Sequence, residues 1–215
     1  VPPIMMSEPY FGIFGQTSGP VPYYYEEAVK LAGHSCGAVT GAWTITRKAL
    51  EALYPNGEIP VRGQIAVEAP GAEDEWFVGV FGDIITFVTG AAPHTGFNGS
   101  EFGVVNPLFV RQNKMVYKDE PTGQLPPMRE WIFTSLDTGA KVGVKFNLVI
   151  ILPIPTPGNG AAADADGVDP HPGGELPGGE AVVVRQRRLG GAVGRVAPAA
   201  DPAHDRGDVD HPAPA

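Results

Sequence analysis

Apolar residues recur at helical spacing in three stretches of the chain. Residues 25–32 combine Ala28, Val29 and Leu31 with two early glutamates, and Gly33 follows as a stop signal. Residues 37–53 have the clearest pattern, with apolar or small side chains recurring every three to four positions. A third apolar stretch covers residues 79–88. The pattern therefore predicts three helices.

Alternating and β-branched stretches predict strands in the rest of the chain. Residues 61–68 alternate with a period of two, and residues 102–112 and 115–119 are further candidates. Residues 130–150 are typical of two strands joined by the turn LDTGA. The order of these elements predicts an α+β domain with helices packed on a mostly antiparallel sheet.

Composition divides the chain into three parts. From residue 155 to residue 215 the sequence contains no Phe, Tyr, Trp, Met, Lys or Ser, and Gly, Ala, Pro, Asp and Arg dominate. Such a segment buries too little apolar surface to offset its backbone entropy. We therefore expect an N-terminal arm over residues 1–22, a folded domain over 23–152, and a disordered Gly/Pro/Ala/Asp-rich tail over 153–215.

Charge and hydropathy limit the classes of partner. The 215-residue chain has a formal net charge of −9, which argues against nucleic acid and against an anionic membrane surface. No stretch approaches the roughly 20 apolar residues of a membrane span. We expect a soluble, cytoplasmic protein, with the removal of a leader before Val1 left open.

The single cysteine of the chain stands in the sequence GHSC, two residues after a histidine. On an extended or turning segment His34 and Cys36 can face one point, and Gly33 and Gly37 permit such a turn. Imidazole and thiolate are good ligands for zinc and for other borderline or soft metals. His34 and Cys36 therefore suggest a metal site that needs further ligands from elsewhere.

Several residues are candidates for the remaining roles. His94, in a Gly-rich loop, is a candidate third ligand, and Glu68 or Asp83 could serve as a ligand or a base. The structural alternative is that Cys36 is a small buried residue and that His34 caps the end of the first helix. In the same alternative, Asp83 is a helix cap or a buried acceptor and His94 is a surface histidine.

Three blocks of the sequence resemble the FmdE domain family of the formylmethanofuran dehydrogenases, particularly its stand-alone bacterial members. They are the stretch YEEAVKLAGHSCGAVTGAWTITRKALEALYPNGEIPVRGQIAVEAPGAEDE, the stretch GVFGDIITFVTGAAPHTGFNG and the stretch FTSLDTGAKV, which fall between residues 25 and 145. The resemblance implies an α+β fold related to the catalytic domain of glyceraldehyde-phosphate dehydrogenase. It also implies a homodimer, and metal ligation, commonly of zinc, by His34 and Cys36.

The chain departs from that family at defined positions. Gly37 stands where many members have Pro, and Ala91 stands in the Thr-Gly-Cys loop where they have a further cysteine. His94, three residues on, is the hypothetical replacement for that thiolate. The C-terminal zinc-ribbon module of several members is absent, and the tail resembles nothing in the family.

These observations favour a metal-binding or metallocofactor-binding domain with an accessory or carrier role, beside a redox or metalloenzyme partner. Its cofactor would be a divalent metal, with zinc first. One alternative is a small metal-dependent enzyme with an open coordination position. Another is a heme protein in which His34 or Cys36 is axial and Trp43, Phe81 and Phe87 form an aromatic wall. The last is a protein-interaction domain with a vestigial site.

Overall fold

The structure is a computed structural model that describes residues 1–13, 19–98, 109–119, 129–146 and 182–187. The helices are α1 (Pro9–Ile13), α2 (Tyr25–Ala32), α3 (Gly37–Leu53) and α4 (Val78–Thr89). The strands are β1 (Ile4–Met6), β2 (Val21–Tyr23), β3 (Ile65–Glu68), β4 (Met115–Val116), β5 (Arg129–Ser135), β6 (Lys141–Phe146) and β7 (Val182–Arg187).

One five-stranded sheet organises the domain, with the strand order β4-β3-β5-β6-β7. Strand β3 runs parallel to β4, and the other neighbouring pairs are antiparallel. Helix α4 provides the connection that returns the chain from β3 toward β4, as a parallel pair requires. The predicted α+β class, with helices on a mostly antiparallel sheet, is confirmed.

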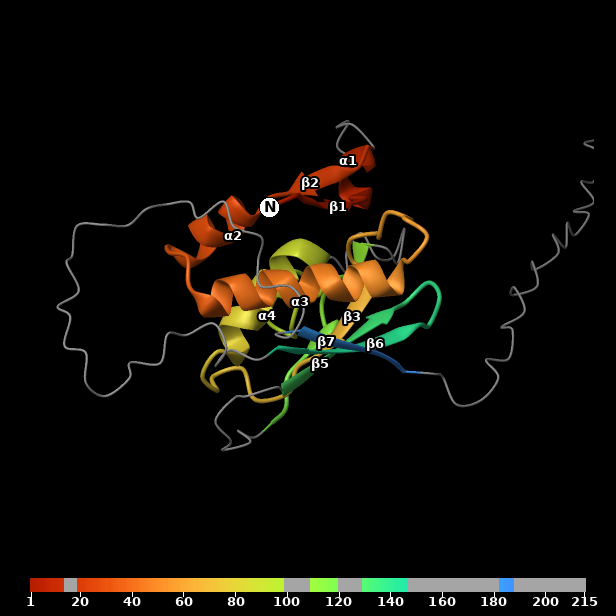
Figure 1. Cartoon of the computed structure of the whole chain (residues 1–215). Coiled ribbons are helices and arrows are strands. Elements are labelled where there is room, and N and C mark those ends of the chain that lie inside the picture. Colours follow the sequence, from red (N-terminus) through yellow and green to blue (C-terminus); the bar gives the residue numbers. More distant parts are fainter. Residues whose placement is uncertain (14–18, 99–108, 120–128, 147–181, 188–215) are drawn as a thin grey trace, which may run out of the picture.

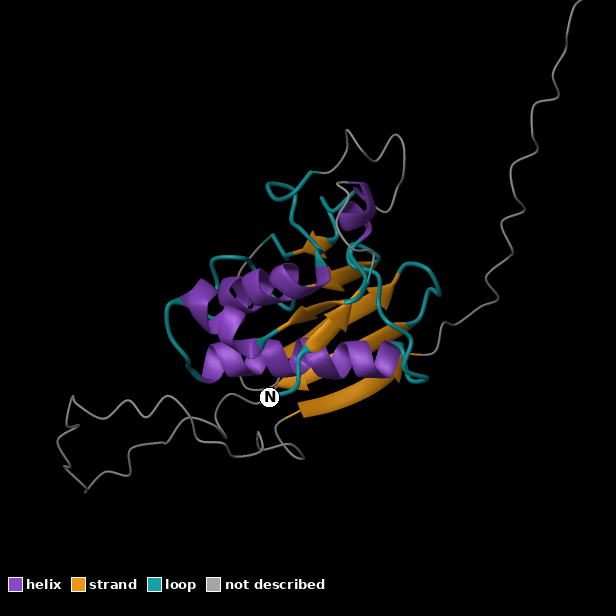
Figure 2. Cartoon of the chain, turned by 90° about the horizontal axis from the view of Figure 1, so that it is seen from above, coloured by secondary structure: helices purple, strands orange, loops and turns teal. Residues whose placement is uncertain are grey.

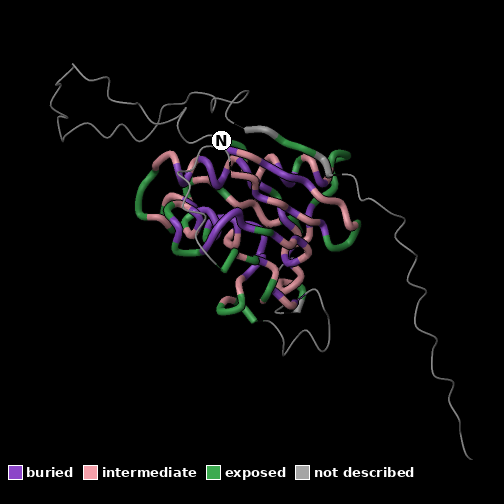
Figure 3. The backbone as a smooth tube through the Cα atoms, turned by 90° about the horizontal axis from the view of Figure 1, so that it is seen from below, coloured by how far each residue is buried: buried purple, intermediate pink, exposed green. Residues whose placement is uncertain are grey.

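Helices α3 and α4 cover one face of this sheet (Figures 1 and 2). The strand residues that face the helices are fully or almost fully buried: Ile65, Val67, Trp131, Phe133, Ser135, Val142, Val144 and Phe146. In Figure 3 the buried positions lie in the interior of the described part of the chain, and the exposed positions lie mainly at its edges. The core therefore lies between α3, α4 and the sheet.

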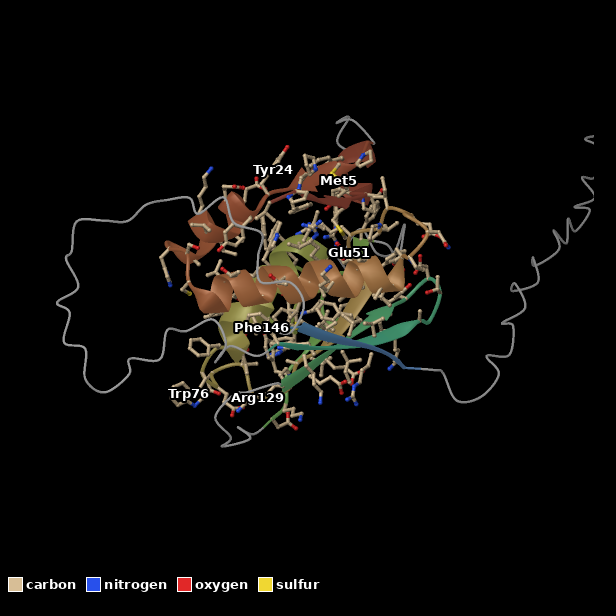
Figure 4. All side chains as sticks on the ribbon, viewed as in Figure 1. Met5, Tyr24, Glu51, Trp76, Arg129 and Phe146 are labelled. Atoms are coloured by element: carbon tan, nitrogen blue, oxygen red, sulfur yellow. The ribbon has the colours of Figure 1, made fainter. Side chains whose placement is uncertain are left out.

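Small residues on α3 allow this close packing. A Cβ atom on Gly41 would overlap the ring of Phe146, which lies between α3 and the sheet (Figure 4). The opposite, half-exposed side of α3 carries polar residues such as Arg47 and Lys48. The three helices predicted from the pattern are confirmed as α2, α3 and α4.

The predicted strands are found in part. The two-stranded unit at the end of the domain is confirmed as β5 and β6, joined by the turn at residues 136–140. Of residues 61–68 only Ile65–Glu68 form a strand, because Val61 bridges to Ser7 and Gly63 takes a left-handed φ of 88°. Residues 102–108 lie outside the described part of the chain, and residues 109–112 are not a strand.

The N-terminal segment belongs to the fold, whereas the sequence predicted an arm over residues 1–22. Strands β1 and β2 pair antiparallel, Ile4 to Tyr23, and lie with α1 on the side of the helices away from the sheet (Figure 1). Ile4 and Met6 are buried in the core. The predicted domain boundary at residue 23 therefore falls inside β2. The sequence does not reveal this strand, because three residues are too few for a clear pattern and the pairing with β1 forms only on folding.

One stretch of the C-terminal segment, for which the sequence predicts disorder over residues 153–215, forms a strand in the described part of the chain. Val182–Arg187 form β7, which pairs with β6 along its whole length and places Val184 opposite Val144. Three consecutive valines give this stretch a β preference that its Gly/Pro-rich surroundings lack. The rest of that segment lies outside the described residues.

Candidate metal-binding segment between α2 and α3

The GHSC sequence forms the non-helical link between α2 and α3. Gly33 ends α2 in the left-handed conformation, with φ 75°, and its N–H donates to the Lys30 carbonyl at 3.4 Å. Cys36 is extended, with φ −146° and ψ 176°, and begins α3 by accepting a hydrogen bond from the Thr40 N–H at 2.9 Å. Both candidate ligands therefore lie on the turning segment that the sequence predicts.

The imidazole of His34 is exposed and has one defined contact. Its Nδ1 lies 3.0 Å from the carbonyl oxygen of Ala32. Because a carbonyl only accepts, Nδ1 donates in this contact, and in the neutral ring the lone pair is then on Nε2. Histidines that bind metals commonly donate their other ring N–H in this way. The same bond is the helix-end contact expected in the structural alternative, so it is compatible with both interpretations.

Cys36 is a free thiol with a partly buried side chain. It packs against the hydrophobic core as a partly buried residue. The thiol is therefore neither wholly exposed nor enclosed, and it stands two residues from an exposed imidazole. This donor set of one nitrogen and one sulfur suits zinc.

Hydroxyl groups surround the link. The phenolic oxygen of Tyr25, at the start of α2, lies 2.8 Å from Ser35 Oγ and 2.8 Å from Thr40 Oγ1. The Tyr25 ring meets the indole of Trp43 edge to face, with the ring centroids 5.9 Å apart. The sequence identified Tyr25 only as a helix residue, because a contact across ten and fifteen positions leaves no periodic signal.

The described part of the chain brings no third ligand to His34 and Cys36: within it, no group of three or more His, Cys, Asp and Glu side chains could hold a metal ion. His94 is exposed in the loop after α4, where it lines a pocket of about 630 Å³ together with Glu73, Asp74 and Asp119. Its carbonyl accepts a hydrogen bond from the Gln112 side chain. His94 thus has acidic neighbours and does not complete the pair.

The aromatic residues proposed for a heme wall each pack against a different ring. Trp43 is fully buried in the core, with Tyr25 as its neighbour. Phe81 stacks on Trp131 at 5.8 Å, whereas Phe87 meets Tyr23 at 5.2 Å. Trp43 is engaged in the core and presents no free face to a cofactor.

The two carboxylates considered as bases lie on other surfaces. Glu68 is exposed on the sheet face opposite the helices, and its carboxylate is 3.4 Å from Lys141 Nζ. Asp83 is on the exposed side of α4, and desolvation by burial raises the pKa of its carboxyl group. Neither joins His34 and Cys36 in a three-residue group.

A buried ionic cluster, which the sequence did not reveal, lies at the C-terminal end of α4. Glu8 bonds Arg62 at 2.9 Å and Arg111 at 2.6 Å, with side-chain exposures of 5%, 18% and 4% respectively. Arg62 also donates to the carbonyls of Phe87 and Val88, the last-turn acceptors of α4. The three residues come from segments far apart in the chain, so only folding brings them together.

Comparison with protein-family models, curated proteins and solved structures finds no match for this chain. Among the described residues, no helix combines the length and apolar character needed to cross a bilayer. The fold and site therefore define an α+β domain with an exposed His-x-Cys link between two helices.

Proposed function

We propose that this protein is a metal-binding or metallocofactor-binding domain in which His34 and Cys36 are the ligands and whose role is accessory or that of a carrier. The observation that carries this proposal is the placement of an exposed imidazole and a free thiol two residues apart on one non-helical link, with His34 Nδ1 3.0 Å from the Ala32 carbonyl oxygen. This contact leaves Nε2 as the donor atom of an exposed ring, next to a free thiol. The resemblance to the FmdE domain family supports the same pair.

Zinc is the first choice of metal because it accepts one imidazole and one thiolate among its ligands. Bound there, it would supply an open coordination position, since a structural zinc site normally has four closed protein ligands. Water, a metal-bearing cofactor or a second protein chain would complete the shell. A homodimer, or a redox or metalloenzyme partner, is part of this proposal.

An accessory role fits the surroundings better than catalysis does. Among the described residues, the hydroxyls of Tyr25, Ser35 and Thr40 bond to one another at the link, and no carboxylate hydrogen-bonds to His34 or Cys36. A metal-dependent enzyme would need a base within about 3 Å of its substrate. Heme binding is less favoured because Trp43 is enclosed in the core.

Elemental analysis of protein purified without oxygen tests the proposal. We expect near-stoichiometric metal in the wild type and its loss in both His34→Ala and Cys36→Ser. His94→Ala is the matched control, because it removes an imidazole that lies in a different pocket, and it should retain the metal.

Three results would count against the proposal. Metal that is retained in both variants would contradict the ligand pair, whereas loss in His94→Ala would make that imidazole a further ligand. A wild type without metal would favour the protein-interaction alternative. A Soret band in the absorption spectrum would instead favour heme.

A further inference from the structure

Tyr25 connects three segments that meet at the GHSC link. It is the first residue of α2, while its phenolic oxygen contacts Ser35 in the link and Thr40 in the first turns of α3, at 2.8 Å each. Ser35 stands between the two candidate ligands in the sequence. A single side chain therefore bonds the middle of the link to both flanking helices.

The Tyr25 ring is itself held in place. It packs edge to face on Trp43, whose side chain is fully buried, with the centroids 5.9 Å apart. Trp43 lies on α3, two turns after Cys36, so the anchor belongs to the rigid core. The Tyr25 ring is thus held by the core, and its hydroxyl restrains the exposed link.

The two hydrogen bonds of the Tyr25 hydroxyl restrain the link relative to α3. A phenol donates one hydrogen and accepts at its oxygen, and serine and threonine hydroxyls do both. One Tyr25 hydroxyl can therefore satisfy Ser35 and Thr40 together, as donor to one and acceptor from the other. Removing the phenolic oxygen breaks both contacts at once, whereas removing the Ser35 hydroxyl breaks only the contact to the link.

We infer that Tyr25 is a positioning residue: through Ser35 it fixes the orientation of the His34–Cys36 segment relative to α3. For metal binding the inference rests on the proposed function. Its effect on the conformation of the link does not, because the bonds concern only residues of this chain. Groups that hydrogen-bond a metal ligand directly change metal affinity by about 10- to 100-fold when they are replaced, and Tyr25, which acts through Ser35, should lie at the low end of this range.

The test compares Tyr25→Phe with the wild type in the metal-free, reduced full-length chain. The variant keeps the ring on Trp43 and removes only the oxygen. We expect alkylation of Cys36 by iodoacetamide to be several-fold faster, because a released link exposes a thiol that is now partly buried. In competition with a chelator, zinc affinity should fall by about tenfold.

Tyr54→Phe is the matched control. Its hydroxyl bonds Ser135 and Asp137, at 3.3 Å each, at the other end of α3. It should leave both the alkylation rate and the zinc affinity unchanged. Ser35→Ala, at an exposed position, is a second variant that should accelerate alkylation even if Tyr25→Phe folds poorly.

The two claims fail separately. Equal alkylation rates in wild type, Tyr25→Phe and Ser35→Ala would overturn the positioning role, whatever the zinc result. A wild type that takes up no zinc would overturn the proposed function, while the alkylation rates would still decide the role of Tyr25. Acceleration in Tyr54→Phe as large as in Tyr25→Phe would assign the effect to general destabilisation and overturn the inference.

Discussion

The GHSC link and the ionic cluster around Glu8 are opposite ways of placing polar groups in one domain. His34 is exposed and Cys36 partly buried, and the residues that hold the link all lie within residues 25–43. Glu8, Arg62 and Arg111 are largely buried and come from three distant segments. The link keeps donor atoms available, whereas in the cluster one carboxylate is paired with two guanidinium groups.

The contrast shows where to look for function and where to look for stability. A buried carboxylate that pairs with two guanidinium groups holds segments of the fold together, and its loss leaves both cations without their counter-charge. An exposed imidazole and a partly buried thiol contribute little to folding, so their variants should affect binding and leave stability nearly intact. Stability measurements on matched variants can therefore test this distinction between the two regions.

The largest effect is expected for Glu8→Gln. It keeps the shape of the side chain but leaves Arg62 and Arg111 without their shared counter-charge. Removing one partner of a buried ion pair costs about 3 to 5 kcal/mol of unfolding free energy. Urea denaturation would measure the loss.

Glu51→Gln is the control for this prediction. Glu51 is exposed on α3 (Figure 4), where it pairs with Arg47 and Lys48 at 2.9 Å each. Its replacement should cost less than about 1 kcal/mol, as is usual for surface ion pairs. Similar losses in the two variants would contradict a special role for the buried cluster.

An intermediate effect is expected for Gly33→Ala at the start of the link. Gly33 has a φ of 75°, and no atom lies within 4 Å of a Cβ built there, so the cost is conformational rather than steric. A side chain in the left-handed region costs about 1 to 2 kcal/mol. Gly33→Asn, which tolerates this conformation better, should lose less in the same urea experiment. An equal loss in both variants would indicate that the left-handed cap is not the cause.

The smallest effect is expected for Asp83→Asn on α4. Burial raises the pKa of this carboxyl group, so the folded state binds its proton more tightly than the unfolded state does. Stability consequently falls as pH rises from the unfolded pKa through the folded one, and the cost persists at neutral pH. Removing the charge should stabilise the protein at pH 7 by less than about 0.5 kcal/mol, because the side chain is still solvent-accessible.

Thermal unfolding at two pH values would check that sign. The gain from Asp83→Asn should disappear below a pH of about 3.8, where the carboxyl is protonated in both states. If the stabilisation by Asp83→Asn instead grew in acid, it would contradict a raised pKa for the Asp83 carboxyl group. Unlike Glu8, Asp83 forms no salt bridge among the described residues.

The sequence predicted the features that depend on local pattern. Helices α2, α3 and α4 follow from apolar spacing and from Gly33, and the hairpin of β5 and β6 follows from its turn residues. It missed the folded N-terminus and β7, because three-residue strands and a strand from a Gly/Pro-rich segment gain their stability from distant partners. The bridge between Ser7 and Val61 shortened the strand predicted over residues 61–68 for the same reason.

The site was predictable to the same extent. The pair His34 and Cys36 stands out from spacing and residue type, and the structure places both on the link as expected. The sequence suggested His94 as the third ligand because it lies three residues after the Thr-Gly-Ala loop. The structure instead places His94 in a pocket that Glu73 and Asp119 also line. Tyr25 was invisible as a site residue because its contacts to Ser35 and Thr40 are defined only once α2 has folded back on α3.

X-ray absorption spectroscopy at the zinc edge tests the central claim most directly. On full-length protein purified without oxygen and loaded with one equivalent of zinc, the account predicts one sulfur scatterer at about 2.3 Å and nitrogen or oxygen scatterers at about 2.0 Å. In Cys36→Ser the sulfur contribution should vanish. A wild-type spectrum without a sulfur neighbour, or one that Cys36→Ser leaves unchanged, would contradict the claim that the GHSC link is a metal site.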